Sequence, residues 1–268
     1  MSASAATVME RDTLLSQQDG APVEIINPYG DSKIVLVCEH ASNLVPLHLS
    51  NLGLTPDQLN SHIGWDLGAR DLAVRLSKAL NAPLVAARFS RLVYDCNRPP
   101  EALSAMPHET EVCLVPGNEG ISNEERLARA EEIYVPFHRA VSDVLRHKRR
   151  AGIDPIVVTI HSYTPVFKGE KRDVEIGYLH ADDDRLSKAL EYFSTYGTSY
   201  NIRLNEPYAP VDGVLHSIEK HLEDGSFDYV MIEVRNDLLQ DEDKHSAIFS
   251  LLSKCIPEAV SSLDDQLS

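Results

Sequence analysis

Five short apolar runs constrain the fold of this chain more than any other feature. They are rich in β-branched residues, each ends at polar residues, and they span 34–38, 84–87, 156–160, 176–179 and 229–234. Continuous apolar runs of this length are typical of strands that are covered on both faces. The pattern therefore predicts a central sheet that is buried between two outer layers.

The segments between the runs have the 3.6-residue period of amphipathic helices. A long helix is predicted to begin at Ser122, because Glu125 three positions later completes a capping-box pattern, and Pro136 predicts a kink within it. Other helices are predicted over 68–80, 183–196 and 244–255. Strands that alternate with helices predict a three-layer αβα fold whose central sheet is mixed and mainly parallel.

The length of 268 residues suits one α/β domain with a large core. Residues 1–24 are interpreted as a loose N-terminal arm or an edge element, and residues 25–268 as a single domain. The stretch 99–121 is rich in Pro, Gly and Glu and is predicted to be a long loop. Loops of this length are often functional.

Charge and composition exclude several classes of partner. The net charge is −16 and the pI about 5.0, which argues against binding to nucleic acid or to anionic membranes. The first residues lack the apolar core of a secretory signal, and no apolar run is long enough for a spanning helix. The four cysteines form no CxxC pair, as is usual for reduced thiols. We therefore expect a cytoplasmic protein that acts on a small molecule.

Polar side chains follow three of the predicted strands. His40 comes after the first run, His161 after the third, and Glu233 lies in the fifth run. Ligands of open α/β sheets bind beyond the carboxyl ends of the strands. Two imidazoles and a carboxylate supply the ligands and the base of a catalytic zinc site. One histidine alone would be an ordinary solvated or packed residue, but three such groups at one edge indicate a metal site.

Asp66 allows two interpretations. It precedes a predicted helix, where Asp commonly caps the first turn, and its spacing favours that role. It could also supply a third, oxygen ligand to a metal ion.

The segment 90–100 is densely polar and follows the second run. Arg91 and Arg98 suit the binding of a substrate carboxylate, because guanidinium binds carboxylate in a bidentate manner. The alternative is a structural salt bridge from either arginine to Asp95. His138, on the long helix, is by itself an ordinary packed histidine.

Two other functional classes stay open. Ser42 or Ser162 could act as a nucleophile, although no GxSxG elbow is present to expose either serine. The chain could also bind a metal or ligand without catalysis.

Seven segments together resemble the N-formylglutamate amidohydrolase family, in a divergent branch. They are CEHASNLVP (38–46), GWDLGA (64–69), SRLVYDCNRPP (90–100), YVPFHRAV (134–141), IHSYTPVFKG (160–169), NEPY (205–208) and IEVRNDL (232–238). The resemblance covers residues 33–239 and implies a fold similar to the zinc carboxypeptidases and the phosphorylase/hydrolase group. It also implies hydrolysis of N-formyl-L-glutamate to formate and glutamate, a step in histidine breakdown.

The resemblance also implies roles for individual residues. His40 and His161 would bind one divalent metal ion, with zinc the leading candidate and Asp66 a candidate third ligand. Glu233 would act as the acid–base residue, and Arg91 would assist at the reacting carbonyl. The implied substrate-binding residues are Arg91, Asn97, Arg98, His138, Asn205 and Arg235.

The sequence departs from the family pattern at two places. Carboxypeptidase-like sites use His-x-x-Glu, but position 43 here is Asn, which leaves the third ligand open. The segment IGWDLGARD (63–71) replaces a longer aromatic and acidic one. Specificity for a glutamyl group therefore stays open, and the wider expectation is an N-formyl or N-acyl amino acid.

Overall fold

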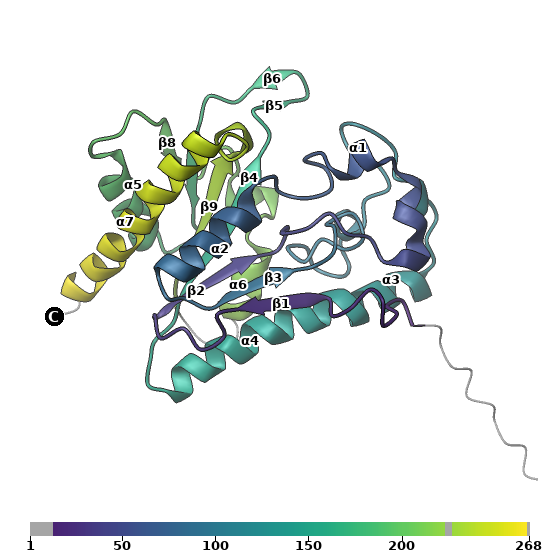
Figure 1. Ribbon diagram of the computed structural model, residues 1–268, viewed down its shortest axis with the longest axis horizontal. Helices are drawn as coiled ribbons and strands as arrows, with labels where there is room; N and C mark the ends of the chain where they lie inside the picture. The colour runs from purple at the N-terminus through teal and green to yellow at the C-terminus, as the bar shows by residue number, and fades with distance from the viewer. Residues whose placement is uncertain (1–12, 223–226, 267–268) are drawn as a thin grey trace, which may run out of the picture.

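A seven-stranded mixed sheet forms the centre of the computed structural model, which describes residues 13–222 and 227–266 (Figure 1). The strand order is β1-β3-β2-β4-β9-β7-β8. The bounds are β1 (Val23–Ile26), β2 (Ile34–Cys38), β3 (Leu84–Ala87), β4 (Ile156–Tyr163), β7 (Ile176–Leu179), β8 (Ile202–Leu204) and β9 (Asp228–Arg235). A separate hairpin pairs β5 (Val166–Phe167) with β6 (Glu170–Lys171).

The centre of the sheet is parallel and its edges reverse direction. Strands β3, β2, β4 and β9 run parallel to one another. β1 joins β3 in antiparallel fashion, β7 joins β9 in the same way, and β8 runs parallel to β7. The prediction of a mixed, mainly parallel sheet is confirmed.

Both faces of the sheet are buried, as the continuous apolar runs predict. In β2, Val35 and Val37 belong to one core cluster, whereas Ile34, Leu36 and Cys38 belong to the other. Successive side chains of a strand point to opposite faces, so one strand supplies both cores.

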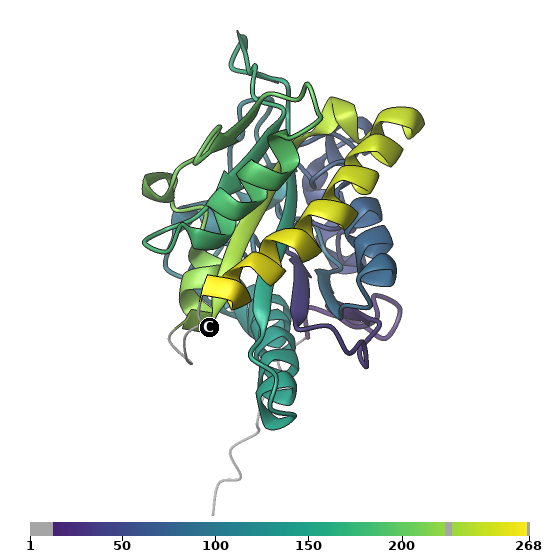
Figure 2. The ribbon, with the colours of Figure 1, turned by 90° about the vertical axis from the view of Figure 1, so that its left-hand side faces the viewer.

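Helices cover the two faces separately. One face carries α2 (Ala69–Ala79), α5 (Arg185–Thr195) and α7 (Glu242–Gln266), and α5 and α7 lie at the end of the sheet nearest the viewer in Figure 2. The other carries α4 (Val135–Arg150) and α6 (His216–Leu222). The short α1 (Pro56–Leu59) lies in a connecting segment. Together these layers confirm the predicted αβα arrangement.

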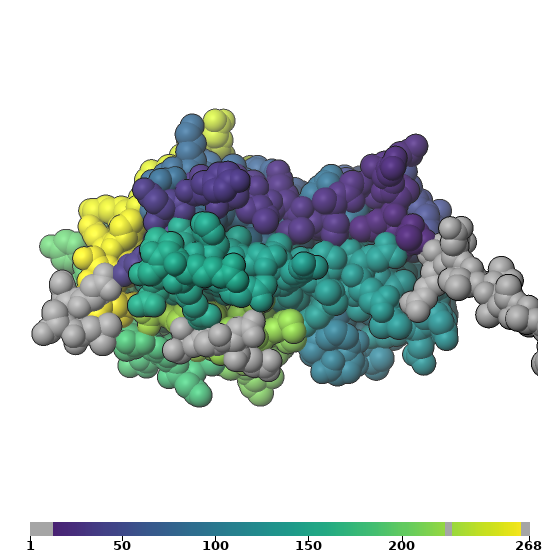
Figure 3. Space-filling model, turned by 90° about the horizontal axis from the view of Figure 1, so that it is seen from below, coloured from purple at the N-terminus to yellow at the C-terminus, as the bar shows by residue number. Residues whose placement is uncertain are grey.

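The long predicted helix begins at the expected residue but is interrupted. Ser122 and Glu125 form the capping box at the start of α3 (Asn123–Arg129). A π-helical turn, η4 (Ala130–Tyr134), then separates α3 from α4, and Pro136 lies in the first turn of α4. The predicted irregularity near Pro136 is therefore a π turn directly before it. Figure 3 shows α3 and α4 running along this face of the molecule beside the N-terminal strand.

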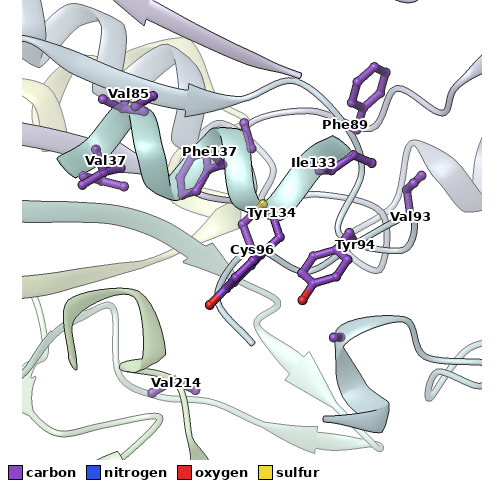
Figure 4. Close-up of a cluster of buried hydrophobic side chains, with 14 of the residues drawn as sticks. Val37, Val85, Phe89, Val93, Tyr94, Cys96, Ile133, Tyr134, Phe137 and Val214 are labelled. Carbon is purple, nitrogen blue, oxygen red and sulfur yellow. The ribbon is translucent and has the colours of Figure 1, made fainter. Parts of the chain in front are cut away.

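Side chains of this irregular segment form the core over β2 and β3. Ile133, Tyr134 and Phe137 are buried, and Figure 4 shows Phe137 close to Val37 and Val85. The loop after β3 adds further side chains to the same cluster, so the core also holds the segment that carries the polar residues 90–98.

The last helix is longer than predicted. The prediction ended it at Cys255, but α7 continues through Pro257 to Gln266. A proline inside a helix costs about 3 kcal/mol. Burial of Ala259, Val260 and Leu263 against the core offsets that cost.

The predicted N-terminal arm lies partly outside the described residues, which begin at residue 13. Its predicted boundary at residue 24 falls inside β1, which begins at Val23 and is an edge strand of the sheet. Among the described residues, none of the helices combines the length and the apolar character that a membrane span requires.

Candidate metal-dependent active site

Three buried side chains meet at the carboxyl ends of the parallel strands. His40 lies just beyond β2, His161 lies near the end of β4, and Asp66 precedes α2. Each can offer one ligand atom, and these atoms lie within 4.8 Å of one another. The three residues therefore form a group that could hold a metal ion.

One oxygen of Asp66 is the meeting point of this group. Asp66 Oδ2 lies 2.9 Å from His161 Nδ1 and 3.3 Å from His40 Nδ1. It also accepts a hydrogen bond from the backbone N–H of Ser162 at 3.2 Å. The two Nδ1 atoms thus face a shared carboxylate.

The interpretation of Asp66 as a helix cap is wrong. Helix α2 begins at Ala69, its N-cap residue is Gly68, and no side chain caps its first turn. Gly68 has a φ of 79°, and this left-handed turn lies between Asp66 and the helix. The carboxylate is thereby free to turn away from the helix and toward the two histidines.

The Nε2 atom of each histidine faces a carboxylate of its own. His40 Nε2 lies 2.7 Å from Asp95 Oδ1. His161 Nε2 lies 3.0 Å from Glu39 Oε2, although the two groups meet at an angle that does not form a hydrogen bond. Partners of this kind fix the tautomer and orientation of metal-binding histidines. Asp95 and Glu39 therefore leave the two Nδ1 atoms as the candidate ligand atoms.

The buried charges of the site are predominantly negative. Glu39, Asp66, Asp95 and Glu233 are all buried, and Arg91 pairs with two of these carboxylates. Burial opposes their ionisation, yet His40 and Arg91 hold the pKa of Asp95 well below its usual range. Burial also opposes charge on His161, but the carboxylates of Glu39 and Asp66 raise its pKa well above its usual value. The site thus attracts positive charge strongly.

The donor set fits a divalent metal ion. Two imidazole nitrogens and one carboxylate oxygen match the ligands that zinc takes in catalytic sites. Beside them, Glu233 Oε2 is buried without a hydrogen-bond partner among the described residues. Buried polar atoms are normally paired, so this oxygen is available to a ligand of the site.

Glu233 lies beside His161. The register of β4 and β9 pairs these two residues, so their side chains leave the same face of the sheet. Burial raises the pKa of Glu233 to about 7. A carboxyl group with such a pKa can both accept and release a proton near neutral pH.

An open cavity of about 260 Å³ lies over this group. Asp66, Arg91 and Asp95 line it, and Arg98 lies at its wall. Its other lining residues include Ser162, Tyr163, Phe167 and Tyr208, together with Glu109 and Glu111 of the predicted long loop. The cavity therefore reaches the buried group at Asp66, whereas His40, His161 and Glu233 are not among its lining residues.

The two arginines of the segment 90–100 differ in their partners. Arg91 donates to Asp66 Oδ1 at 3.3 Å and to Asp95 Oδ2 at 3.0 Å, so the proposed salt bridge to Asp95 exists. Arg98 Nη1 donates to the carbonyls of Asn97 and Gly213, and no carboxylate pairs with it among the described residues. Arg98 thus has a positive charge available for a ligand.

Four other predicted substrate-binding residues do not line the cavity. Asn97 is buried and bonds to Val214 O and the N–H of Ser217, and Asn205 accepts a bond from the N–H of His180. Arg235 pairs with Asp237 and Glu175. His138 bonds to Cys96 O and His221, and burial lowers its pKa to about 3.

Sequence reasoning missed Glu39 and Asp95 as parts of the site. Glu39 precedes His40 at the end of β2, and Asp95 was considered only as a partner of the arginines. A carboxylate next to each predicted ligand was the available signal, because metal-binding histidines usually donate to one.

A buried arginine ties the segment around Arg91 to the long loop. Arg129 Nη1 donates to Asn118 Oδ1 at 2.6 Å and to Val93 O at 3.3 Å, and Nη2 donates to Gly117 O at 3.1 Å. Asn118 in turn donates to the carbonyls of Leu92 and Pro107, both at 2.8 Å. Arg129 therefore holds two cavity-lining segments in place.

Arg129→Met is expected to lower the free energy of unfolding by about 3–5 kcal/mol, because it leaves three acceptors without this donor, two of them on buried residues. Urea denaturation measures the change. The control is Arg139→Met, whose side chain is 79% exposed and which should shift stability by less than about 0.5 kcal/mol. Equal stability of the two variants would contradict the structural role of Arg129.

Comparisons with known proteins identify the family and relatives of this chain. Residues 32–240 match the family model described as N-formylglutamate amidohydrolase. A gene product of Agrobacterium tumefaciens is 45% identical, with a TM-score of 0.90 over 94% of this chain and 99% of its own. An N-formylglutamate amidohydrolase from Ralstonia eutropha is 17% identical and shares the fold, with a TM-score of 0.65 over 90% of this chain and 98% of its own.

No curated protein sequence resembles the chain closely enough to count as a match. The family match covers more than half of the chain, from the start of β2 to beyond β9. The chain therefore belongs to the N-formylglutamate amidohydrolase family and is a hydrolase that acts on amide bonds.

Proposed function

We propose that this hydrolase is metal-dependent and cleaves the amide bond of an N-formyl or N-acyl amino acid. The observation that carries the proposal is the meeting of His40 Nδ1 and His161 Nδ1 at one carboxylate of Asp66. N-formyl-L-glutamate is the leading candidate substrate, because the family and the Ralstonia enzyme bear its name. Its products would be formate and glutamate, as in histidine breakdown, and we expect the enzyme to act in the cytoplasm.

His40, Asp66 and His161 would hold one divalent ion, and their nitrogen and oxygen donors favour zinc. When bound, such an ion would polarise the scissile carbonyl and lower the pKa of water. Asp95 would orient His40 through Nε2, and Glu39 would do the same for His161 by its charge.

Glu233 would serve as the acid–base residue. It would take a proton from the attacking water and then deliver that proton to the leaving amine. Its raised pKa, about 7, suits both transfers. Its Oε2 atom has no competing hydrogen bond among the described residues, so it is available to the water.

The arginines would divide the binding of substrate. Arg98, which has no carboxylate partner in the described chain, would bind the α-carboxylate of the amino acid. Arg91 would hold Asp66 and Asp95 in place beside the reacting carbonyl. Asn97, Asn205, Arg235 and His138 would act from outside the cavity, by supporting its walls.

The experiment that tests this function is a screen for release of free amine. The zinc-loaded enzyme is offered N-formyl-L-glutamate, then N-formyl and N-acetyl forms of other L-amino acids. We expect turnover of at least one, with a loss of activity when the α-carboxylate is amidated. No turnover of any of them, by protein that contains the metal, would contradict the proposed reaction and favour a binding protein.

A serine nucleophile finds little support. Ser162 Oγ donates to Leu67 O at 2.8 Å, and Ser42 Oγ accepts from the N–H of Leu44 at 3.2 Å. In the part of the chain that the structure describes, neither hydroxyl bonds to a histidine that could act as its base, which nucleophilic serines require.

A further inference from the structure

Tyr208 places a phenol hydroxyl at the wall of the cavity. It lies in the segment after β8 and lines the cavity together with Tyr163 and Phe167. Its oxygen accepts a hydrogen bond from Arg172 Nη1 at 2.9 Å. A hydroxyl that accepts such a bond still has its own proton to donate. That proton has no acceptor among the described residues.

Arg172 is fixed firmly enough to orient this hydroxyl. Its guanidinium lies 4.6 Å, 4.9 Å and 5.5 Å from the ring centres of Phe167, Tyr208 and Tyr163. Its carbonyl accepts a hydrogen bond from Arg235 Nη1 at 3.1 Å. Cation–π contacts of this kind hold the guanidinium plane against the rings. A cationic donor also polarises the hydroxyl and makes it a stronger donor in turn.

Tyr163 lines the same cavity but cannot play this part. Its hydroxyl donates to the carbonyl of Val174, on the buried side of the residue. Both tyrosines contribute a ring to the wall of the cavity. Of the two, only Tyr208 has a hydroxyl proton that is available to a ligand.

Tyr208 shares its cavity with the candidate site, since Asp66, Arg91 and Asp95 also line it. Burial raises the pKa of Tyr208, so the phenol keeps its proton at neutral pH. The two terminal nitrogens of Arg91 already donate to Asp66 and Asp95, whereas the Tyr208 hydroxyl has no acceptor among the described residues.

We propose that the Tyr208 hydroxyl donates a hydrogen bond to the carbonyl oxygen of the scissile amide and stabilises the negative charge that develops there. The inference rests on the proposed amide hydrolysis. As the water oxygen bonds to the carbonyl carbon, the π electrons move onto the carbonyl oxygen and Glu233 takes the water proton. When the electrons return, the C–N bond breaks and the amine receives the proton from Glu233. Tyr208 keeps its proton throughout, and Arg172 is a positioning residue.

Tyr208→Phe tests the role directly, because it removes the hydroxyl and keeps the ring. Loss of one such donor typically lowers kcat by about 10²–10³-fold. We expect a decrease of that size with little change in KM, since the bond strengthens as charge develops. Tyr192→Phe is the matched control, and its kcat should stay within about threefold of wild type, because Tyr192 lies on α5, is 71% exposed and does not line the cavity.

Arg172→Met tests the positioning role and serves as a second variant if Tyr208→Phe does not fold. It should lower kcat by about tenfold or more, and Arg172→Lys should restore part of the loss. A Tyr208→Phe variant with wild-type kcat, or with raised KM alone, would overturn the proposal while leaving amide hydrolysis intact. Absence of turnover in the wild type itself would instead defeat the proposed reaction, and this inference with it.

Discussion

Glu233→Gln is expected to lower kcat by about 10²–10⁴-fold, the usual contribution of a general acid–base residue. Gln keeps the size of the side chain but can neither take a proton from water nor return it to the leaving amine. Because Glu233 is buried beside His161, the loss should affect the chemical step and leave substrate binding nearly unchanged. Steady-state kinetics of the zinc-loaded variant measure both constants.

The same variant should keep its metal, since Glu233 is outside the ligand group. Zinc content therefore separates loss of the base from loss of the ion. Glu132→Gln is a suitable control, because the Glu132 carboxylate accepts hydrogen bonds from the backbone N–H groups of residues 14 and 15 and is not part of the candidate site. Unchanged kcat in Glu233→Gln would show that another group moves the proton.

His161→Ala is expected to lose most of its bound metal and, with it, turnover. The substitution removes one of three candidate ligand side chains, which is also the histidine partner of Glu39 and one of the two histidine partners of Asp66. Sites with three protein ligands depend on each of them. Metal content of the purified variant, with and without added zinc, measures the effect.

A loss of fold could imitate this result, so a second histidine is needed as a control. His245 is also buried, but it lies on α7, contacts Arg75 and is not one of the candidate ligands. His245→Ala should keep its metal. Equal metal content in both variants and the wild type would contradict the assignment of His161 as a ligand.

The sequence predicts the sheet and the edge at which the site lies because both depend on short-range patterns. Apolar runs that end in polar residues identify the parallel strands, and parallel strands bring His40, His161 and Glu233 to one edge. That much follows from the continuous apolar runs and from strand direction.

The direction of Asp66 could not be predicted in the same way. It depends on the left-handed turn at Gly68, which separates Asp66 from α2. Because of this turn, Asp66 does not cap the helix, although its spacing favours that role. The contact between Asp95 and His40 depends on the path of the loop after β3, which packs against Ile133 and Tyr134. Such loop paths are fixed by tertiary packing and not by local sequence.

The continuation of α7 past Pro257 has a similar cause. Helix propensity disfavours a proline inside a helix, but the burial of apolar side chains beyond Pro257 stabilises the helical conformation.

The most direct test of the central claim is turnover of N-formyl-L-glutamate by one enzyme sample before chelation, after complete removal of metal, and after addition of zinc. If His40, Asp66 and His161 hold a catalytic ion, activity should vanish on removal and return when about one equivalent of zinc is restored. Full activity in the metal-free protein would contradict a metal-dependent mechanism.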